Sequence, residues 1–186
     1  MSYCYDAVIQ RLETHRGYLH LLAESQLDRR LRAKFDADDV VQETMQLAYT
    51  KYPQLREPEN PAVVKNWLRE ILCNVLIDHG KRYSADKRNV HLEQSLADQV
   101  QRSAEVLDRW LVAEHTSPSM AAARNEEAAR LALGVRQLPD DMREVIVQRH
   151  LNNKSVAEIA ELTGRSPASV AGLLRRGLAK LRDYLG

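Results

Sequence analysis

A group of cations near the C-terminus has no acidic residue among its members. Residues 165–182 contain five cations, namely Arg165, Arg175, Arg176, Lys180 and Arg182. Such side chains bind phosphate groups, and a helix that carries several of them suits the major groove of DNA. The outward positions near the start of this segment hold small residues with few base-edge hydrogen bonds to offer: Ala168, Ser169, Ala171 and Gly172. We therefore expect phosphate contact more than base readout. The alternative is a pair of antiparallel helices with a solvated basic face.

The elements that must position these cations are two short helices joined by a glycine turn. Ser155 and Glu158 have the spacing of a capping box. The inner face of the helix that begins there is expected to hold Ile159, Ala160 and Leu162. Gly164 can end this helix in the left-handed conformation, and Ser166 with Pro167 can begin the next one. The core face of the second helix is predicted at Val170, Leu173, Leu174, Leu178 and Leu181. This pattern predicts a helix-turn-helix.

A second group of polar residues is acidic and opens a helix in the N-terminal half. Asp36 has the type and position of an N-cap, and further carboxylates in the first turn suit the positive end of the helix dipole. The apolar face of this helix, which ends before Pro53, is Val40, Val41, Met45, Ala48 and Tyr52. The opposite face carries Asp39, Gln42, Glu43 and Gln46 at spacings of i, i+3, i+4 and i+7. Its charge suits a basic protein partner better than DNA. The alternative is a solvated acidic turn.

The clearest helical periodicity follows the loop at residues 53–61. Asn60 is expected to cap this helix, with Pro61 at its first position. Its apolar stripe is Val64, Trp67, Leu68, Ile71, Leu72, Val75 and Leu76, which favours a core role for Trp67 over base stacking. Cations outnumber acids along the helix and its exit: Lys65, Arg69, Lys81, Arg82, Lys87 and Arg88. They form an electrostatic track suited to a single strand. Asn74 and Asp78, one turn apart, could instead hydrogen-bond to each other.

Composition limits the class of protein. The 186 residues are 44% hydrophobic, 28% charged and only 5% aromatic, which favours a globular all-α fold. The net charge of +1 does not indicate a particular class of binding partner. Cys4 and Cys73 lie far apart and the six histidines have no ligand spacing, so we expect no disulfide scaffold, no metal site and no cofactor. Asp78 and His79 are the only hint of a metal-dependent hydrolase; we interpret His79 as a packing residue and expect no enzyme activity.

The chain also lacks an apolar run of about 20 residues, as a membrane span needs, and its N-terminus lacks the features of a signal peptide. We therefore expect a cytoplasmic protein without membrane insertion.

The chain divides into two small helical domains joined by a linker. The first domain is expected at residues 1–90 and begins with a helical pattern over residues 6–32 that is loosened around Gly17. Residues 91–117 hold five acids and two arginines and form an acidic linker. Its apolar residues could make one helix face: Leu92, Leu96, Val100, Leu107, Trp110 and Leu111. The second domain, residues 118–186, begins with a helical segment at about 120–137 and a further helix opening at Pro139.

Two blocks of the sequence resemble bacterial RNA polymerase sigma factors of the extracytoplasmic-function (ECF) group of the sigma-70 family. Asp36-Ala-Asp-Asp-Val-Val-Gln-Glu-Thr44, Trp67-Leu-Arg-Glu-Ile-Leu-Cys-Asn74, Asp78 and Lys81-Arg82 resemble conserved region 2. Leu138-Pro139 through Tyr184 resembles region 4, although Ala171-Gly172-Leu173 departs from the common recognition helix. The resemblance covers roughly residues 25–85 and 118–186, in the family's order.

The resemblance implies a promoter-specificity subunit that binds core RNA polymerase and directs transcription initiation. Region 2 would dock on the clamp of the largest polymerase subunit through Asp39, Gln42, Glu43 and Gln46. The minus-ten element would lie near the loop 54–63 and near Lys65, Arg69, Asn74, Asp78, Lys81 and Arg82. The minus-thirty-five duplex would meet Arg165, Ser166, Ser169, Arg175, Arg176 and Lys180.

Two further points follow from the resemblance. Many members of this family are held inactive by an anti-sigma protein, which is therefore a candidate partner. The alternative function is a stand-alone helix-turn-helix regulator, which would need a dimer interface and a palindromic site. The acidic face of the second helix argues for a different kind of partner.

Overall fold

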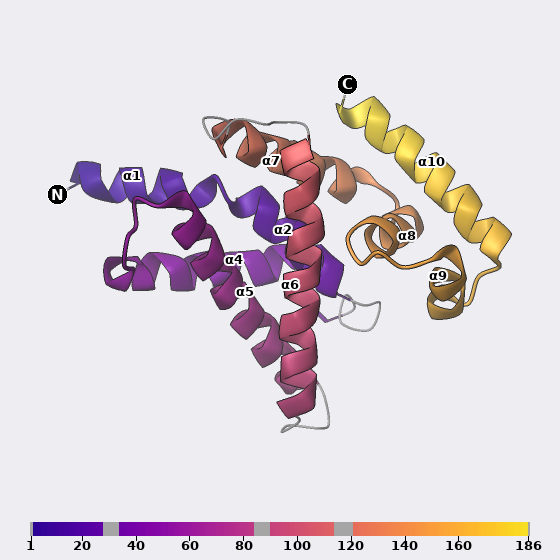
Figure 1. The fold of residues 1–186 in the computed structure, drawn as a ribbon, viewed down its shortest axis with the longest axis horizontal. Coiled ribbons are helices and arrows are strands. Elements are labelled where there is room, and N and C mark those ends of the chain that lie inside the picture. Colours follow the sequence, from indigo (N-terminus) through magenta and orange to yellow (C-terminus); the bar gives the residue numbers. More distant parts are fainter. Residues whose placement is uncertain (1, 28–33, 84–89, 114–120, 186) are drawn as a thin grey trace. The chain divides into compact units, whose positions relative to one another are not determined.

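The chain folds into helices and turns in a computed structural model of residues 1–186, which describes all of them except 1, 28–33, 84–89, 114–120 and 186. The described residues include no strand, which confirms the all-α class (Figure 1). They form two compact units, residues 1–101 and 102–186. Lys87 and Arg88, predicted as part of the single-strand track, lie outside the described residues.

Unit 1 is built around three helices that pack on one another in pairs: α2 (Arg16–Gln26), α4 (Ala37–Lys51) and α5 (Pro61–Tyr83). Helix α1 (Ser2–Glu13) also contacts α4, and the short 3-10 helix η1 (Tyr52–Gln54) follows α4 directly. The core side chains come from all three central helices, among them Leu19, Leu22, Val40, Met45, Leu68 and Leu72. Burying such a side chain contributes about 1.5–3 kcal/mol, so this apolar interior holds α4 and α5 together.

Local capping fixes where the two long helices of unit 1 begin. The Asp36 carboxylate accepts the Asp39 backbone N–H at 2.9 Å, and the Asp39 carboxylate accepts the Asp36 N–H at 3.0 Å. At the start of α5, the Asn60 side chain accepts the Ala62 N–H at 3.0 Å. Both predicted N-caps are confirmed.

The first predicted helical stretch is divided two residues before Gly17. Helix α1 ends at Glu13 and α2 begins at Arg16. The Thr14 hydroxyl donates to the Arg11 carbonyl at 2.7 Å, and the His15 N–H bonds to the Leu12 carbonyl at 3.0 Å. A threonine side chain that bonds to a backbone carbonyl of the preceding turn competes with the helical hydrogen bonds, so the break falls there.

Helix α6 (Val90–Ala113) occupies most of the predicted linker, so the helical alternative for these residues is correct. The division between the two compact units falls inside this helix, whereas the predicted boundaries at 90/91 and 117/118 stay predictions. Val100 and Leu107 are buried, and the Ser103 hydroxyl lies 3.1 Å from the Asn152 amide oxygen within unit 2. The side chains of Leu92, Trp110 and Leu111 lie outside the described part.

Unit 2 contains α7 (Ala121–Gln137), α8 (Asp140–His150), α9 (Val156–Thr163) and α10 (Pro167–Leu185). Helix α10 contacts each of the other three. Its packing on α8 is close, because a Cβ at Gly177 would lie 3.0 Å from Ile146 Cγ1. The shared core of α8, α9 and α10 is Val145, Ile159, Ala160, Val170 and Leu173. The predicted helix-turn-helix, α9 followed by α10, is confirmed.

Two leucines assigned to this core by sequence are exposed. Leu162 is 61% exposed because the inward face of α9 is centred on Val156, Ile159 and Ala160, and position 162 lies beside that face. Leu178 is 40% exposed because Gly177, one position earlier, makes the contact with α8. The predicted core positions Val170, Leu173 and Leu181 are buried.

Candidate functional site

The outward face of α4 borders an open groove of about 690 Å³. The groove contains all four residues predicted for polymerase docking, Asp39, Gln42, Glu43 and Gln46, together with Leu47 and Thr50 of the same helix. Lys34 and Phe35, which precede α4, and His79 of α5 complete its lining. The structure therefore brings the predicted docking residues together in one concave surface.

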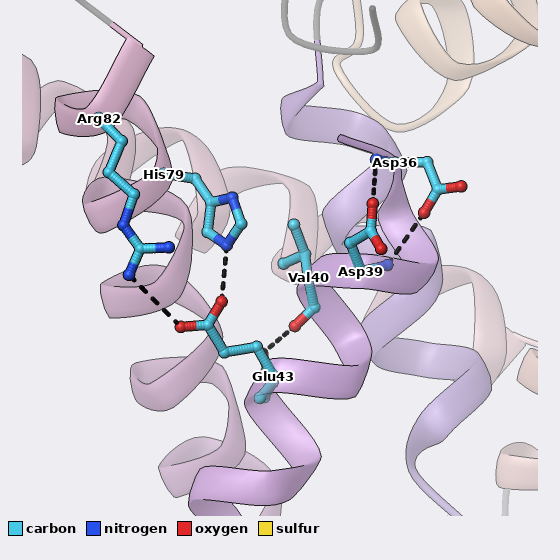
Figure 2. Close-up of polar contacts among 7 residues, drawn as sticks. Asp36, Asp39, Val40, Glu43, His79 and Arg82 are labelled. Atoms are coloured by element: carbon cyan, nitrogen blue, oxygen red, sulfur yellow. Dashed lines mark hydrogen bonds and ion pairs between the residues drawn. The ribbon is translucent and has the colours of Figure 1, made fainter. Parts of the chain in front are cut away.

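Glu43 is held by two side chains from α5 (Figure 2). Its Oε2 lies 2.7 Å from His79 Nε2, and its Oε1 lies 3.9 Å from Arg82 Nη2. The His79 ring also packs against Phe35, with 4.5 Å between ring centroids. The prediction that His79 is a packing residue is confirmed by its 8% exposure. The sequence did not predict the contact of His79 with Glu43, because a hydrogen bond between two helices does not change the periodicity of either helix.

The other three docking candidates are exposed, but they differ in what they already bind. Asp39 uses its carboxylate in the capping box with Asp36 (Figure 2). Gln42 and Gln46 make no side-chain hydrogen bond to any described residue. These two glutamines therefore offer amide donors and acceptors to a partner without cost to the fold, whereas Asp39 and Glu43 also have structural roles.

The residues predicted near the minus-ten element lie along α5 in different states. Asn74 and Asp78 are exposed, and among the described residues neither side chain makes a hydrogen bond, so the mutual bond left open by the sequence is not formed. Lys65 is half-buried, with its ammonium 4.2 Å above the Tyr18 ring. Two further cations of α5 contact other side chains: Arg69 donates to the Asn66 side chain, and Arg82 pairs with Glu43. Lys81, also on α5, is half-buried.

Trp67 is half-buried, so its predicted place in the core is only partly correct. Its ring meets the edge of Tyr52, with 6.4 Å between centroids and 65° between planes. Tyr52 belongs to η1, which directly precedes the loop between α4 and α5. Trp67 thus connects α5 to the segment that precedes this loop.

The basic residues predicted to meet DNA in unit 2 are exposed on the helix-turn-helix. Gly164 adopts φ +65°, and the Ser166 hydroxyl accepts the Ser169 N–H at 3.2 Å to cap α10. The cations of this set make no ion pair with any described residue; they are Arg165, Arg175, Arg176 and Lys180. Side chains that carry charge without an internal partner remain available to phosphate groups.

Gly172 has a specific effect on this surface. A Cβ at position 172 would lie 3.3 Å from Arg176 Nη1, so the Arg176 guanidinium lies close against the bare backbone of α10. The departure from the common family helix at this position therefore lets an arginine lie where a side chain would otherwise project.

Two kinds of site are absent from the described part of the chain. No group of three or more His, Cys, Asp or Glu side chains in it could hold a metal ion. None of its helices has the length and apolar character to cross a membrane.

A helix-turn-helix whose second helix carries cations that pair with no described residue gives unit 2 the features of a DNA-binding domain. Residues 129–181 match the family described as "Sigma-70, region 4". The chain is also 26% identical over 184 residues to "ECF RNA polymerase sigma factor SigM" of Mycobacterium tuberculosis, strains H37Rv and Erdman. This similarity covers 99% of the chain and 78% of each relative. The chain is therefore similar to an ECF sigma factor over nearly its whole length, and part of unit 2 matches region 4 of the sigma-70 family.

Proposed function

We propose that the chain binds core RNA polymerase and directs transcription initiation at promoters. The observation that carries this proposal is the presence in one chain of two different surfaces: an acid-lined groove on unit 1 and a helix-turn-helix with unpaired cations on unit 2. A stand-alone regulator would use only the second surface. The full-length similarity to an ECF sigma factor supports a role for both.

The groove of α4 is the proposed docking surface for the clamp of the largest polymerase subunit. It combines carboxylates, two uncommitted amides and the half-buried Leu47 in a concave shape, which suits a basic helix-rich partner. The exposed polar residues of α5, with the loop 54–63, are proposed to meet the minus-ten element. Helix α10 is proposed to meet the minus-thirty-five duplex. An anti-sigma protein stays a predicted partner, and a cytoplasmic location follows from the proposed role.

The first test is capture of purified core RNA polymerase by Gln42→Arg/Gln46→Arg. These substitutions place two positive charges in the groove while the contacts of Asp39 and Glu43 stay intact. Because like charges across an interface disfavour association, we expect at least about tenfold weaker binding than wild type. The matched control is Ala7→Arg/Gln10→Arg, which adds the same charge at exposed positions of α1.

The outcomes separate the function from the docking face. Loss of binding only in the groove variant supports both polymerase binding and the α4 groove as the docking face. Equal binding by all three proteins would keep the polymerase partner and move the docking face away from α4. Failure of wild type to bind, under conditions where a known sigma factor associates, would contradict the proposed function and favour the stand-alone regulator.

A further inference from the structure

The loop between α4 and α5 has a defined and costly backbone conformation. Glu57 adopts φ +55°, in the left-handed region that residues other than glycine rarely occupy. The Asn60 N–H donates to the Glu57 carbonyl at 3.0 Å and closes a turn around it. Such conformations persist only where surrounding contacts hold them, and they occur preferentially at functional sites. The question is what holds this loop.

Arg11 of α1 makes the contacts that hold it. Its Nη1 donates to the Pro58 carbonyl at 2.9 Å and lies 3.4 Å from the Tyr52 hydroxyl. Its Nη2 donates to Glu59 Oε2 at 2.8 Å. One guanidinium thus connects Tyr52 of η1, just before the loop, with a backbone carbonyl in the middle of the loop and a carboxylate near its end.

Only arginine can make this set of contacts. Its guanidinium is planar and offers several donors in a fixed geometry, whereas lysine offers a single ammonium. The hydrogen bond to the Pro58 carbonyl holds the loop backbone directly and does not depend on the side chain at that position. Tyr52, the third partner, meets Trp67 of α5, so the contacts of Arg11 extend to the helix proposed to face the minus-ten element.

We propose that Arg11 is a positioning residue for promoter recognition, which holds residues 54–63, the loop 55–60 with the residues on either side of it, in the conformation that meets the minus-ten bases. This inference rests on the proposed function. Recognition of bases requires polar groups placed within a fraction of an ångström, and the exposed loop side chains Gln54, Arg56 and Asn60 depend on the backbone that carries them. Arg11 lies far from the loop in sequence and touches no base itself.

The role is distinct from a contribution to stability. The Glu59 side chain is 82% exposed and that of Arg11 is 40% exposed, and ion pairs in such surroundings contribute little to folding. Loss of the guanidinium should therefore release the loop while the rest of unit 1 stays folded.

The order of the loop can be measured without polymerase or DNA, by trypsin cleavage after exposed Arg56. In Arg11→Gln we expect cleavage at this site to be about fivefold faster than in wild type, because proteolysis follows the population of the open loop. Thermal unfolding of the variant should remain close to that of wild type. Gln10→Ala, an exposed change on the same helix, is the control and should leave cleavage unchanged. Unchanged cleavage in Arg11→Gln would overturn the proposal.

Promoter discrimination is the second readout. Wild type, Arg11→Gln, Arg11→Lys and Gln10→Ala are each assembled with core polymerase and tested on templates with single substitutions in the minus-ten or minus-thirty-five element. We expect both Arg11 variants to lose roughly fivefold or more of the discrimination at minus-ten positions, the effect of one lost base contact. Their polymerase affinity and minus-thirty-five discrimination should match wild type.

The pattern of results decides between the possible roles. A uniform fall on all templates, without a change in discrimination, would overturn the positioning role. Full discrimination by Arg11→Lys would overturn the need for a forked donor. If wild type itself fails to bind polymerase, the proposed function fails, while the trypsin result still reports whether Arg11 orders the loop.

Discussion

At the scale of single residues, His15 shows how burial changes the chemistry of a side chain in unit 1. Its side chain is 5% exposed at the junction of α1 and α2. Burial, assisted by the positive charge of Lys65, lowers the pKa of His15 to about 4. The imidazole is therefore neutral in the folded protein at neutral pH.

This pKa predicts that His15 makes unit 1 less stable in mild acid. The unfolded chain binds a proton at this histidine near pH 6.5, whereas the folded chain does so only near pH 4. Stability is thus lost as the pH falls between those two values. Between pH 7 and 5.5 the loss at this residue should be about 1 kcal/mol. Measured by urea unfolding, the free energy of unfolding of His15→Gln should fall about 1 kcal/mol less than that of wild type between pH 7 and 5.5. An equal fall in both proteins would contradict the lowered pKa of His15.

Sequence predicted the capping residues correctly, since a cap depends on residues only two or three positions apart. Asp36, Asn60 and Ser155 all accept the expected backbone N–H. The contact between Glu43 and His79 could not be predicted in this way, because its partners are 36 positions apart and belong to different helices. Both residues were identified singly, but their distance depends on how α4 packs on α5.

At the scale of elements, α10 presents its cations as one group, which makes a quantitative prediction for DNA binding. Each phosphate contact that is lost should lower the slope of log affinity against log salt by about 0.9. Arg175→Gln/Arg176→Gln should therefore weaken binding to a minus-thirty-five duplex and lower this slope by nearly 2 units, about the value for two contacts. Fluorescence anisotropy over a salt series measures both quantities.

The control for α10 is Arg149→Gln, a single substitution of the same type at the end of α8. The Arg149 guanidinium donates to the Lys154 carbonyl at 2.9 Å and lies outside the basic helix. Its substitution should leave the salt slope near that of wild type. A loss of about 0.9 in the control, half that of the double variant, would mean that binding follows net charge and not a defined face of α10.

The helix-turn-helix was predictable because short motifs define its caps and turn. The exposure of Leu162 and Leu178 was not predictable. The sequence pattern identifies the apolar face of a helix but not how much of that face the neighbouring helices bury. The outward face of α4 was likewise predicted as a face, but the groove along it is also lined by Phe35 and His79 from outside the helix.

At the scale of the whole molecule, α6 replaces the open linker that acidic composition alone indicates. Leu107 is fully buried on this helix, and exposed arginines flank it at positions 102 and 109. Leu107→Ala should destabilise α6 by about 2–5 kcal/mol. We therefore expect faster trypsin cleavage at Arg102 and Arg109 than in wild type, as detected by mass spectrometry.

Glu105→Ala is the control for α6, because this side chain is exposed on the same helix. It should leave the cleavage rate unchanged. Rapid cleavage of wild type at Arg102 and Arg109 would show instead that these residues form an open connection in solution.

The bond between Glu43 and His79 has a consequence for how tightly a partner is held. A cation that approaches Glu43 in the groove competes with a histidine that already occupies it. If release of this carboxylate costs about 1 kcal/mol, the apparent Kd of the complex rises about fivefold above the intrinsic value. Breaking the Glu43–His79 contact thus offsets part of the binding free energy, and the weakened complex dissociates sooner.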